Sequence, residues 1–120
     1  MIDMVMSVMF CEAFRKQQPE TAAQFREKLN RPNDDGSYFT NRAVLERGNV
    51  LEDLKGVKVP VLVVTSSGDT AVPAKHGSTI AQAIAGAELV EIPDAGHMTA
   101  VERPGFVNEA LASFFDKHMQ

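Results

Sequence analysis

The sequence predicts an α/β fold in which two parallel strands have flanking helices and are preceded by a helical segment. Three observations lead to this prediction: an apolar, β-branched run at 59–65, a shorter apolar run at 88–92, and a helical pattern between them. Strands joined by a helical crossover pair in parallel, with a right-handed connection. Because the first run does not alternate with polar residues, we expect helices on both faces of the sheet.

The helices of this unit are indicated by proline at their starts and by apolar residues at helical spacing. The helix between the strands is predicted to begin at Pro73 and to stop at 85–87, which reads Ala-Gly-Ala. After the second strand, 93–103 is predicted to be a loop, and Pro104 begins the last helix. The apolar faces of these two helices are Gly77, Ile80, Ala81 and Ile84 in the first, and Phe106, Val107, Ala110, Leu111, Phe114 and Phe115 in the second.

The chain changes character near Gly48, so we divide it into a helical segment at 1–48 and the α/β segment at 49–120. The helical segment begins with a mostly apolar stretch that reaches about Gln17. It resembles neither a signal peptide nor a membrane span, because an acidic residue replaces the expected positive one and the apolar part is too short.

A second helix of this segment is predicted from Pro19 to about Arg31. Residues 31–36 have the composition of a turn. Ser37 is predicted to cap a third helix, which ends near Arg47. The two adjacent acids at 34–35 are interpreted as part of the turn rather than as metal ligands.

The composition excludes several function classes. The chain has 120 residues, 44% of them hydrophobic, and its 12 basic and 16 acidic residues give a net charge of −4. Without a basic stripe, we expect no nucleic-acid partner. The single cysteine allows no intramolecular disulfide, and no Cys/His spacing indicates zinc. We therefore expect a cytoplasmic protein with no membrane association, no metal and no cofactor.

Two candidate catalytic residues follow the two predicted strands. Asp69 lies in the loop after the first strand, and His97 lies in the loop after the second. Ligands of parallel α/β sheets bind outside the carboxyl ends of the strands, so both side chains can reach one site. A carboxylate that accepts from one imidazole nitrogen leaves the other nitrogen as a general base. The alternative is a loop-capping Asp and a solvated His.

The sequence around these residues resembles the C-terminal part of an α/β-hydrolase. The similar pieces, in order, are Val59-Pro60-Val61-Leu62-Val63-Val64, Gly68-Asp69 with Val72-Pro73, Ala95-Gly96-His97-Met98, Val101-Glu102-Arg103-Pro104 and Phe114-Phe115. The resemblance implies that Asp69 is the acid and His97 the base of a catalytic triad. It also implies that 1–48 corresponds to helices of the family's cap. Within the family, the sequence is most similar to small esterases and enol-lactonases.

The family's nucleophile is absent from this sequence. In the family, a Gly-x-Ser-x-Gly elbow precedes the acid and the histidine. The chain has six serines, and none of them has glycine both two positions before it and two positions after it. They are Ser7, Ser37, Ser66, Ser67, Ser78 and Ser113. We therefore expect a C-terminal region of a serine-type hydrolase acting on ester, lactone or related carbonyl bonds, inactive alone because it lacks the nucleophile and the oxyanion loop.

Other residues carry weaker signals. Met98 could line a substrate pocket or pack in the core, and both interpretations stay open. Ser67 is interpreted as a turn residue, Cys11 as an inert packed thiol, and His76 as solvated. Glu102 is expected to serve the turn into the last helix, by local hydrogen bonds or by its charge near the helix N-terminus.

A two-stranded sheet leaves strand edges that another chain can pair with. We therefore expect either a homodimer or a separate N-terminal half that carries the nucleophile, with a small-molecule substrate in the complete enzyme. The alternative function is a non-catalytic oligomerising or interaction module derived from a hydrolase.

Overall fold

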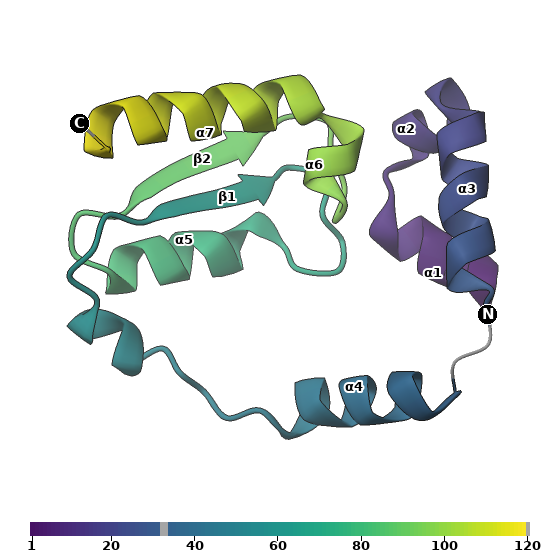
Figure 1. Cartoon of the computed structure of the whole chain (residues 1–120), viewed down its shortest axis with the longest axis horizontal. Coiled ribbons are helices and arrows are strands. Elements are labelled where there is room, and N and C mark those ends of the chain that lie inside the picture. Colours follow the sequence, from purple (N-terminus) through teal and green to yellow (C-terminus); the bar gives the residue numbers. More distant parts are fainter. Residues whose placement is uncertain (32–33, 120) are drawn as a thin grey trace.

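The predicted pair of parallel strands is present. The computed structural model describes residues 1–31 and 34–119 (Figure 1). Strand β1 (Leu62–Ser66) pairs in parallel with strand β2 (Glu88–Ile92), in a register that places Leu62 opposite Glu88 and Ser66 opposite Ile92. The α/β fold class is therefore confirmed.

The first strand begins later than predicted. Its paired part starts at Leu62 rather than at Val59, whose side chain is 67% exposed. The cause lies in the partner strand, because the Glu88 amide, at the start of β2, donates to the Val61 carbonyl at 2.9 Å. Among the described residues, no strand lies opposite those before Val61.

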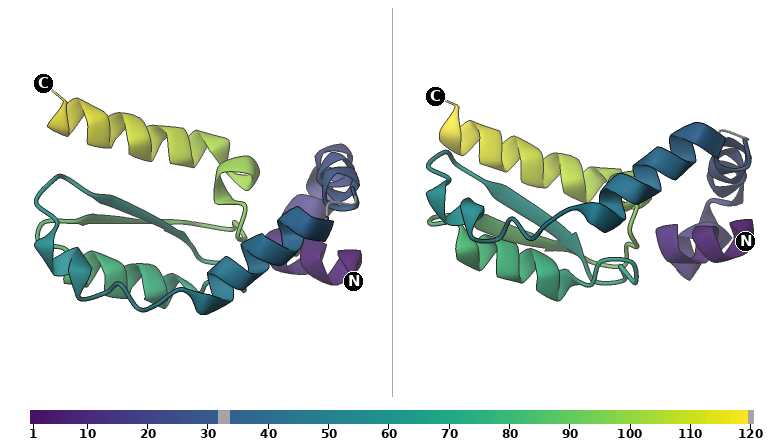
Figure 2. Two further views of the ribbon diagram at one scale, coloured as in Figure 1. Left: turned by 60° about the horizontal axis from the view of Figure 1, so that its bottom comes forward. Right: turned by 90° about the horizontal axis from the view of Figure 1, so that it is seen from below.

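Two helices cover opposite faces of the sheet, as the sequence predicts. Helix α5 (Ala74–Ala83) lies on one face and helix α7 (Pro104–His118) on the other, which gives the three layers seen in Figure 2. Helix α5 approaches β1 closely at Gly77, where an added Cβ would lie 2.0 Å from Thr65 Cγ2. Glycine at this position lets the helix backbone pack directly against the strand.

The covering of the sheet is incomplete. Among the described strand residues, only Ser66 and Ile92 are buried, and the others are half-buried or exposed. The predicted stripe of α7 is likewise partly exposed at Phe106 and Phe115. Each strand has only one neighbour in the described chain, so one edge of each strand is unpaired.

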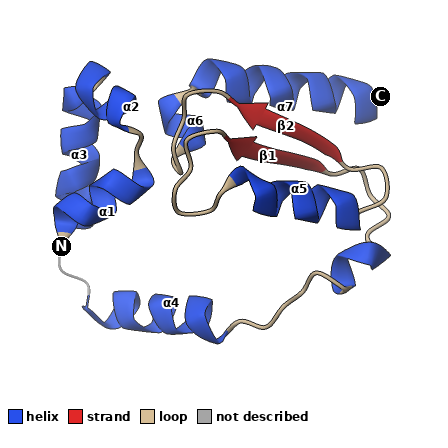
Figure 3. Ribbon diagram, turned by 180° about the vertical axis from the view of Figure 1, so that it is seen from behind, coloured by secondary structure: helices blue, strands red, loops and turns tan. Residues whose placement is uncertain are grey.

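Three helices precede the sheet and form a separate apolar cluster. They are α1 (Ile2–Met9), α2 (Glu12–Gln17) and α3 (Pro19–Leu29), and their buried cluster comprises Met6, Phe10, Phe14 and Ala22. The predicted stretch to Gln17 is divided because Phe10 and Cys11 are extended, and Cys11 Sγ accepts a hydrogen bond from the Phe14 amide at the start of α2. Figure 3 shows that the carboxyl ends of both strands point toward these helices.

The connections differ from the sequence prediction in three places. Helix α4 (Asp34–Glu46) begins before Ser37, so the predicted turn at 31–36 is wrong for residues 34–36. Residues 32–33 of the predicted turn lie outside the described residues. Acidic residues in a first turn favour a helix, which explains the earlier start. The short helices η1 (Asp53–Gly56) and α6 (Thr99–Glu102) were not predicted, and α6 interrupts the expected 93–103 loop. None of the described helices has the length and hydropathy needed to cross a bilayer.

Candidate active site

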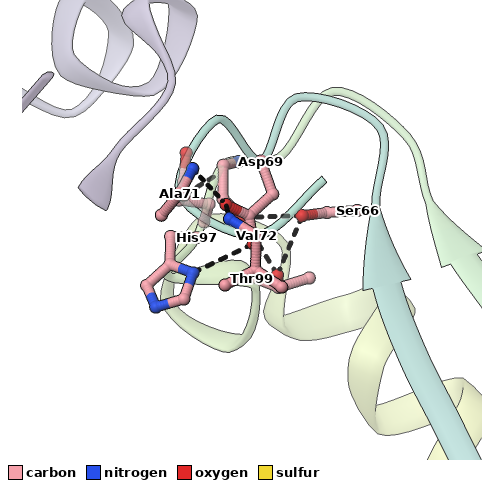
Figure 4. A network of polar contacts seen from close by, with 8 residues as sticks. Ser66, Asp69, Ala71, Val72, His97 and Thr99 are labelled. Carbon is pink, nitrogen blue, oxygen red and sulfur yellow. Dashed lines mark hydrogen bonds and ion pairs between the residues drawn. The ribbon is translucent and has the colours of Figure 1, made fainter. Parts of the chain in front are cut away.

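Asp69 is fixed by the turn that follows β1. Its Oδ1 accepts hydrogen bonds from the backbone amides of Ala71 and Val72, both at 2.8 Å (Figure 4). An aspartate that binds amides two and three residues ahead closes its own turn. One carboxylate oxygen is therefore used to hold the loop, and the other is available to a second partner.

That second partner is His97. Its Nδ1 lies 2.9 Å from Asp69 Oδ2, and the two side chains are 35% and 11% exposed. The pair bridges the loops that follow β1 and β2, as the position of both residues after parallel strands predicts. In the described part of the chain, His97 Nε2 makes no hydrogen bond, and Figure 4 shows the second ring nitrogen directed away from Asp69. This arrangement favours the Nδ1–H tautomer and leaves Nε2 able to accept a proton.

The two loops are also joined through their backbones. The Gly68 amide donates to the Ala95 carbonyl at 2.9 Å, and the Ser67 amide donates to the Ile92 carbonyl at 3.1 Å. The Asp94 amide donates to Ser67 Oγ at 3.1 Å, so the Ser67 hydroxyl holds the loop, in agreement with its interpretation as a turn residue. Asp69 and His97 therefore lie on loops that are held at a fixed separation.

A buried hydroxyl pair supports the residue before His97. Ser66 Oγ donates to the Gly96 carbonyl at 2.7 Å, and Thr99 Oγ1 lies 3.2 Å from Ser66 Oγ and 3.0 Å from the same carbonyl (Figure 4). Neither residue is predicted from the sequence to take part in the site. The available signal was a serine at the end of an apolar strand, where a polar side chain must find a partner when it is buried.

Glu102 has a wider role than the local one predicted from the sequence. Its side chain is buried, its Oε1 accepts from the Gly96 amide at 2.9 Å, and its Oε2 accepts from the Cys11 amide at 2.9 Å. The first bond is local, but the second joins residues 91 positions apart. Spacing along the chain gives no sign of such a long-range bond.

Cys11 has the surroundings of an unreactive thiol. Burial is the largest cause that raises the pKa of this thiol, and the nearby Glu102 carboxylate raises it further. Its Sγ also donates to the Asp94 carbonyl at 3.6 Å. Because the thiolate is the reactive form, a raised pKa disfavours a nucleophilic role for Cys11.

We expect slow alkylation of Cys11 in the folded protein. At pH 7.5, iodoacetamide should modify it about tenfold more slowly than in the urea-unfolded chain, because burial raises its pKa and restricts access. Mass spectrometry over a time course measures both rates. Equal rates in the folded and unfolded chain would show that the fold neither shields the thiol nor lowers its reactivity.

Met98 lies between the apolar cluster of α1–α3 and a surface pocket. It packs against the cluster of α1–α3, and its amide donates to the Met9 carbonyl at 2.9 Å. It also lines a surface pocket of about 310 Å³ beside the catalytic candidate His97. The pocket is otherwise lined by Val64, Thr99, Ala100, Val101 and Val107. A mostly apolar lining beside a histidine is suited to part of a small-molecule ligand.

His76 does not join the site. His76 is exposed on α5, as expected. The side chains at 34–35 lie outside the described residues. Within the part of the chain that the structure describes, no three His, Cys, Asp or Glu side chains gather as metal ligands would.

These features define a class of protein. Two parallel strands with helices on both faces, and an acid and a histidine in the loops after successive strands, are the C-terminal part of an α/β-hydrolase. Residues 38–118, which contain Asp69 and His97, match the family model described as TAP-like protein. The chain belongs to this family of α/β-hydrolases.

Solved structures and a curated relative agree with this assignment. The enol-lactonase of Burkholderia xenovorans is 29% identical with a TM-score of 0.85, over 96% of this chain and 44% of the enzyme. A hydrolase of Pseudomonas aeruginosa is 31% identical with a TM-score of 0.86, over 95% of this chain and 42% of the other.

The "Putative non-heme bromoperoxidase BpoC" of Mycobacterium tuberculosis is 37% identical over 67 residues, which are 56% of this chain and 26% of the relative. The chain therefore spans about a quarter of this curated relative and less than half of the two solved structures.

Proposed function

We propose that Asp69 and His97 are the acid and the base of a Ser-His-Asp triad that hydrolyses ester, lactone or related carbonyl bonds. The observation that carries the proposal is the 2.9 Å contact between Asp69 Oδ2 and His97 Nδ1 at the carboxyl ends of two parallel strands. The similarity to an enol-lactonase and to a further hydrolase supports the reaction class.

In this mechanism, His97 Nε2 accepts the proton of a serine hydroxyl as its oxygen attacks the substrate carbonyl. Asp69 stays ionised, holds the Nδ1–H tautomer and stabilises the imidazolium. His97 then gives the proton to the leaving alkoxide, which yields an acyl-enzyme and an alcohol. Water, deprotonated by His97 in the second half of the reaction, releases the acid and restores the serine.

The proposed nucleophile lies outside these 120 residues. Four serines of this chain use their hydroxyls in backbone contacts: Ser7 with Met4, Ser66 with Gly96, Ser67 with Asp94, and Ser78 with Ala74. None is presented on the strained strand-to-helix elbow that activates a hydrolase serine. The chain therefore supplies two of the three triad residues and is inactive alone.

Complementation tests this proposal. The part of the Burkholderia xenovorans enol-lactonase that precedes the matched region is joined to this chain, and hydrolysis of 4-nitrophenyl acetate is followed. We expect hydrolysis by the chimaera and none by this chain alone. Hydrolysis by the chain alone would contradict the proposal, and so would a folded chimaera without activity.

A second candidate function is a module that assembles with another polypeptide, and exposed apolar residues favour it. Helix α4 exposes Tyr38, Phe39, Val44 and Leu45 to between 51% and 84%, and α7 exposes Phe106 and Phe115 to about half. Exposed apolar residues on two helices, together with unpaired strand edges, are typical of a protein that buries them against a partner.

Both functions imply that the chain does not stay a free monomer when it is isolated. We expect light scattering after size-exclusion chromatography to give at least twice the 13.1 kDa chain mass at micromolar concentrations. Leu45→Glu should shift the population toward monomer, because a charge cannot be buried in an apolar contact without a partner. A stable monomer of the unsubstituted chain across this range would contradict the expectation.

A further inference from the structure

Glu102 is a buried carboxylate whose two oxygens bind backbone amides. Its side chain lies at the end of α6 and is 7% exposed. Its two oxygens each accept one hydrogen bond at 2.9 Å, from Gly96 and from Cys11. A buried charge is costly unless it is hydrogen-bonded, so both amides are needed to keep Glu102 in this place.

The two amides come from distant parts of the chain. Gly96 immediately precedes His97, whereas Cys11 lies at the junction between α1 and α2. The residue after His97 is tied to the same junction, because the Met98 amide donates to the Met9 carbonyl at 2.9 Å. Both neighbours of His97 are therefore held by residues 9–11. Met98 is held directly, and Gly96 is held through Glu102.

The fit between the His97 loop and this junction is close. A Cβ added to Gly96 would lie 2.7 Å from the Cys11 nitrogen, 2.9 Å from Glu102 Oε1 and 3.1 Å from the Phe10 carbonyl carbon. The other side of Gly96 is also fixed, because its carbonyl accepts from Ser66 and Thr99. The loop has little room to move toward or away from Asp69.

From this geometry we infer that Glu102 is a positioning residue, which holds the imidazole of His97 against Asp69 by linking the Gly96 amide to the α1–α2 junction. This inference rests on the proposed function, in which the Nδ1–H tautomer of His97 is the active one. Glu102 does not contact the reacting atoms. The junction at 9–11 is the second support of the loop, so the helical segment at the start of the chain contributes to the geometry of the triad.

The tautomer of His97 tests the inference in the chain itself, without activity. Nitrogen-15 NMR at a pH where the imidazole is neutral gives the ratio of the Nδ1–H to the Nε2–H form. The Nδ1–H form should dominate in the unsubstituted chain. Glu102→Ala should lower the ratio about tenfold, because a loosened loop loses a charge-assisted hydrogen bond to Asp69. Glu102→Gln, which keeps one acceptor oxygen, should give an intermediate ratio.

Cys11→Pro isolates the second support. Cys11 has φ −64° and ψ 154°, and Phe10 before it is extended at φ −124° and ψ 137°, so both backbone conformations suit proline, which removes the thiol and replaces the amide hydrogen that Glu102 accepts by a ring carbon. We expect Cys11→Pro to shift the ratio in the same direction as Glu102→Ala. Cys11→Ala, which keeps the amide, should not shift it.

Ile84→Ala is the control for lost stability, because Ile84 is buried at 5% exposure and lies at the end of α5, outside this network. It should lower the melting temperature and leave the tautomer ratio unchanged. The inference is overturned if Glu102→Gln and Cys11→Pro both fold and keep the unsubstituted ratio. If the unsubstituted chain itself lacks the Nδ1–H form, the proposed function fails together with the inference. If only the variants keep the unsubstituted ratio, the inference about Glu102 fails and the proposed function stands.

Discussion

Asp69→Asn in the complemented chimaera should lower kcat by about 10⁴-fold and change KM little. An asparagine side chain keeps the shape of the turn but presents an amide to His97, so it no longer selects the Nδ1–H tautomer by charge. The loss falls on kcat because the carboxylate stabilises the imidazolium that forms in the transition state. Steady-state hydrolysis of 4-nitrophenyl acetate measures both constants.

Matched variants make this result specific. His97→Gln should cost as much or more, and the double variant should be no worse than the more affected single variant, because residues of a triad act as one unit. Asp94→Asn is the control, since Asp94 lies in the same loop as His97 with a side chain that is 81% exposed. A tenfold or smaller loss in Asp69→Asn would remove Asp69 from the role of triad acid.

Gly96→Ala should destabilise the chain by about 2–4 kcal/mol, because the new methyl group meets the backbone at 10–11. The Cβ would lie 2.7 Å from the Cys11 nitrogen, and a backbone atom cannot swing aside as a flexible side chain can. The loop before His97 must move to relieve this contact. Chemical denaturation followed by circular dichroism measures the change in the free energy of unfolding.

Gly105→Ala is the matched control for this variant. Gly105 lies in the first turn of α7, where an added Cβ has nothing within 4 Å. Its free energy of unfolding should stay the same or rise by up to about 1 kcal/mol, because alanine restricts the unfolded chain. Equal stability of Gly96→Ala and the unsubstituted chain would show that the junction at 9–11 is not tightly packed on the loop.

The parts of the fold that could be predicted are those encoded locally. The apolar run before Asp69, the helix opened by Pro73 and the strand at 88–92 are each decided by neighbouring residues, and the structure has all three. The start of β1 was misplaced because it depends on where the partner strand begins. The predicted start of helix α4 is too late, because the turn-forming residues at 34–36 can equally open a helix.

The same division holds for the candidate site. Asp69 and His97 could be brought together from the sequence because parallel strands end at one edge of the sheet. The contact of Glu102 with Cys11 could not, since it joins residues 91 positions apart across an interface that no local pattern encodes. The hydroxyl of Ser66 was missed for a related reason, because its partner is the Gly96 carbonyl, 30 positions away.

The measurement that tests the central claim most directly is the site of labelling by a fluorophosphonate probe, which forms a bond to an activated serine oxygen with loss of fluoride. The probe is applied to this chain alone and to the chimaera, and peptide mass spectrometry locates the adduct. We predict no adduct on the chain alone and one adduct in the chimaera, on the serine of the added Gly-x-Ser-x-Gly segment, abolished by His97→Gln. An adduct on any of the six serines of this chain, or labelling of the chimaera that persists in His97→Gln, would contradict the assignment of His97 as the base of a triad completed from outside these residues.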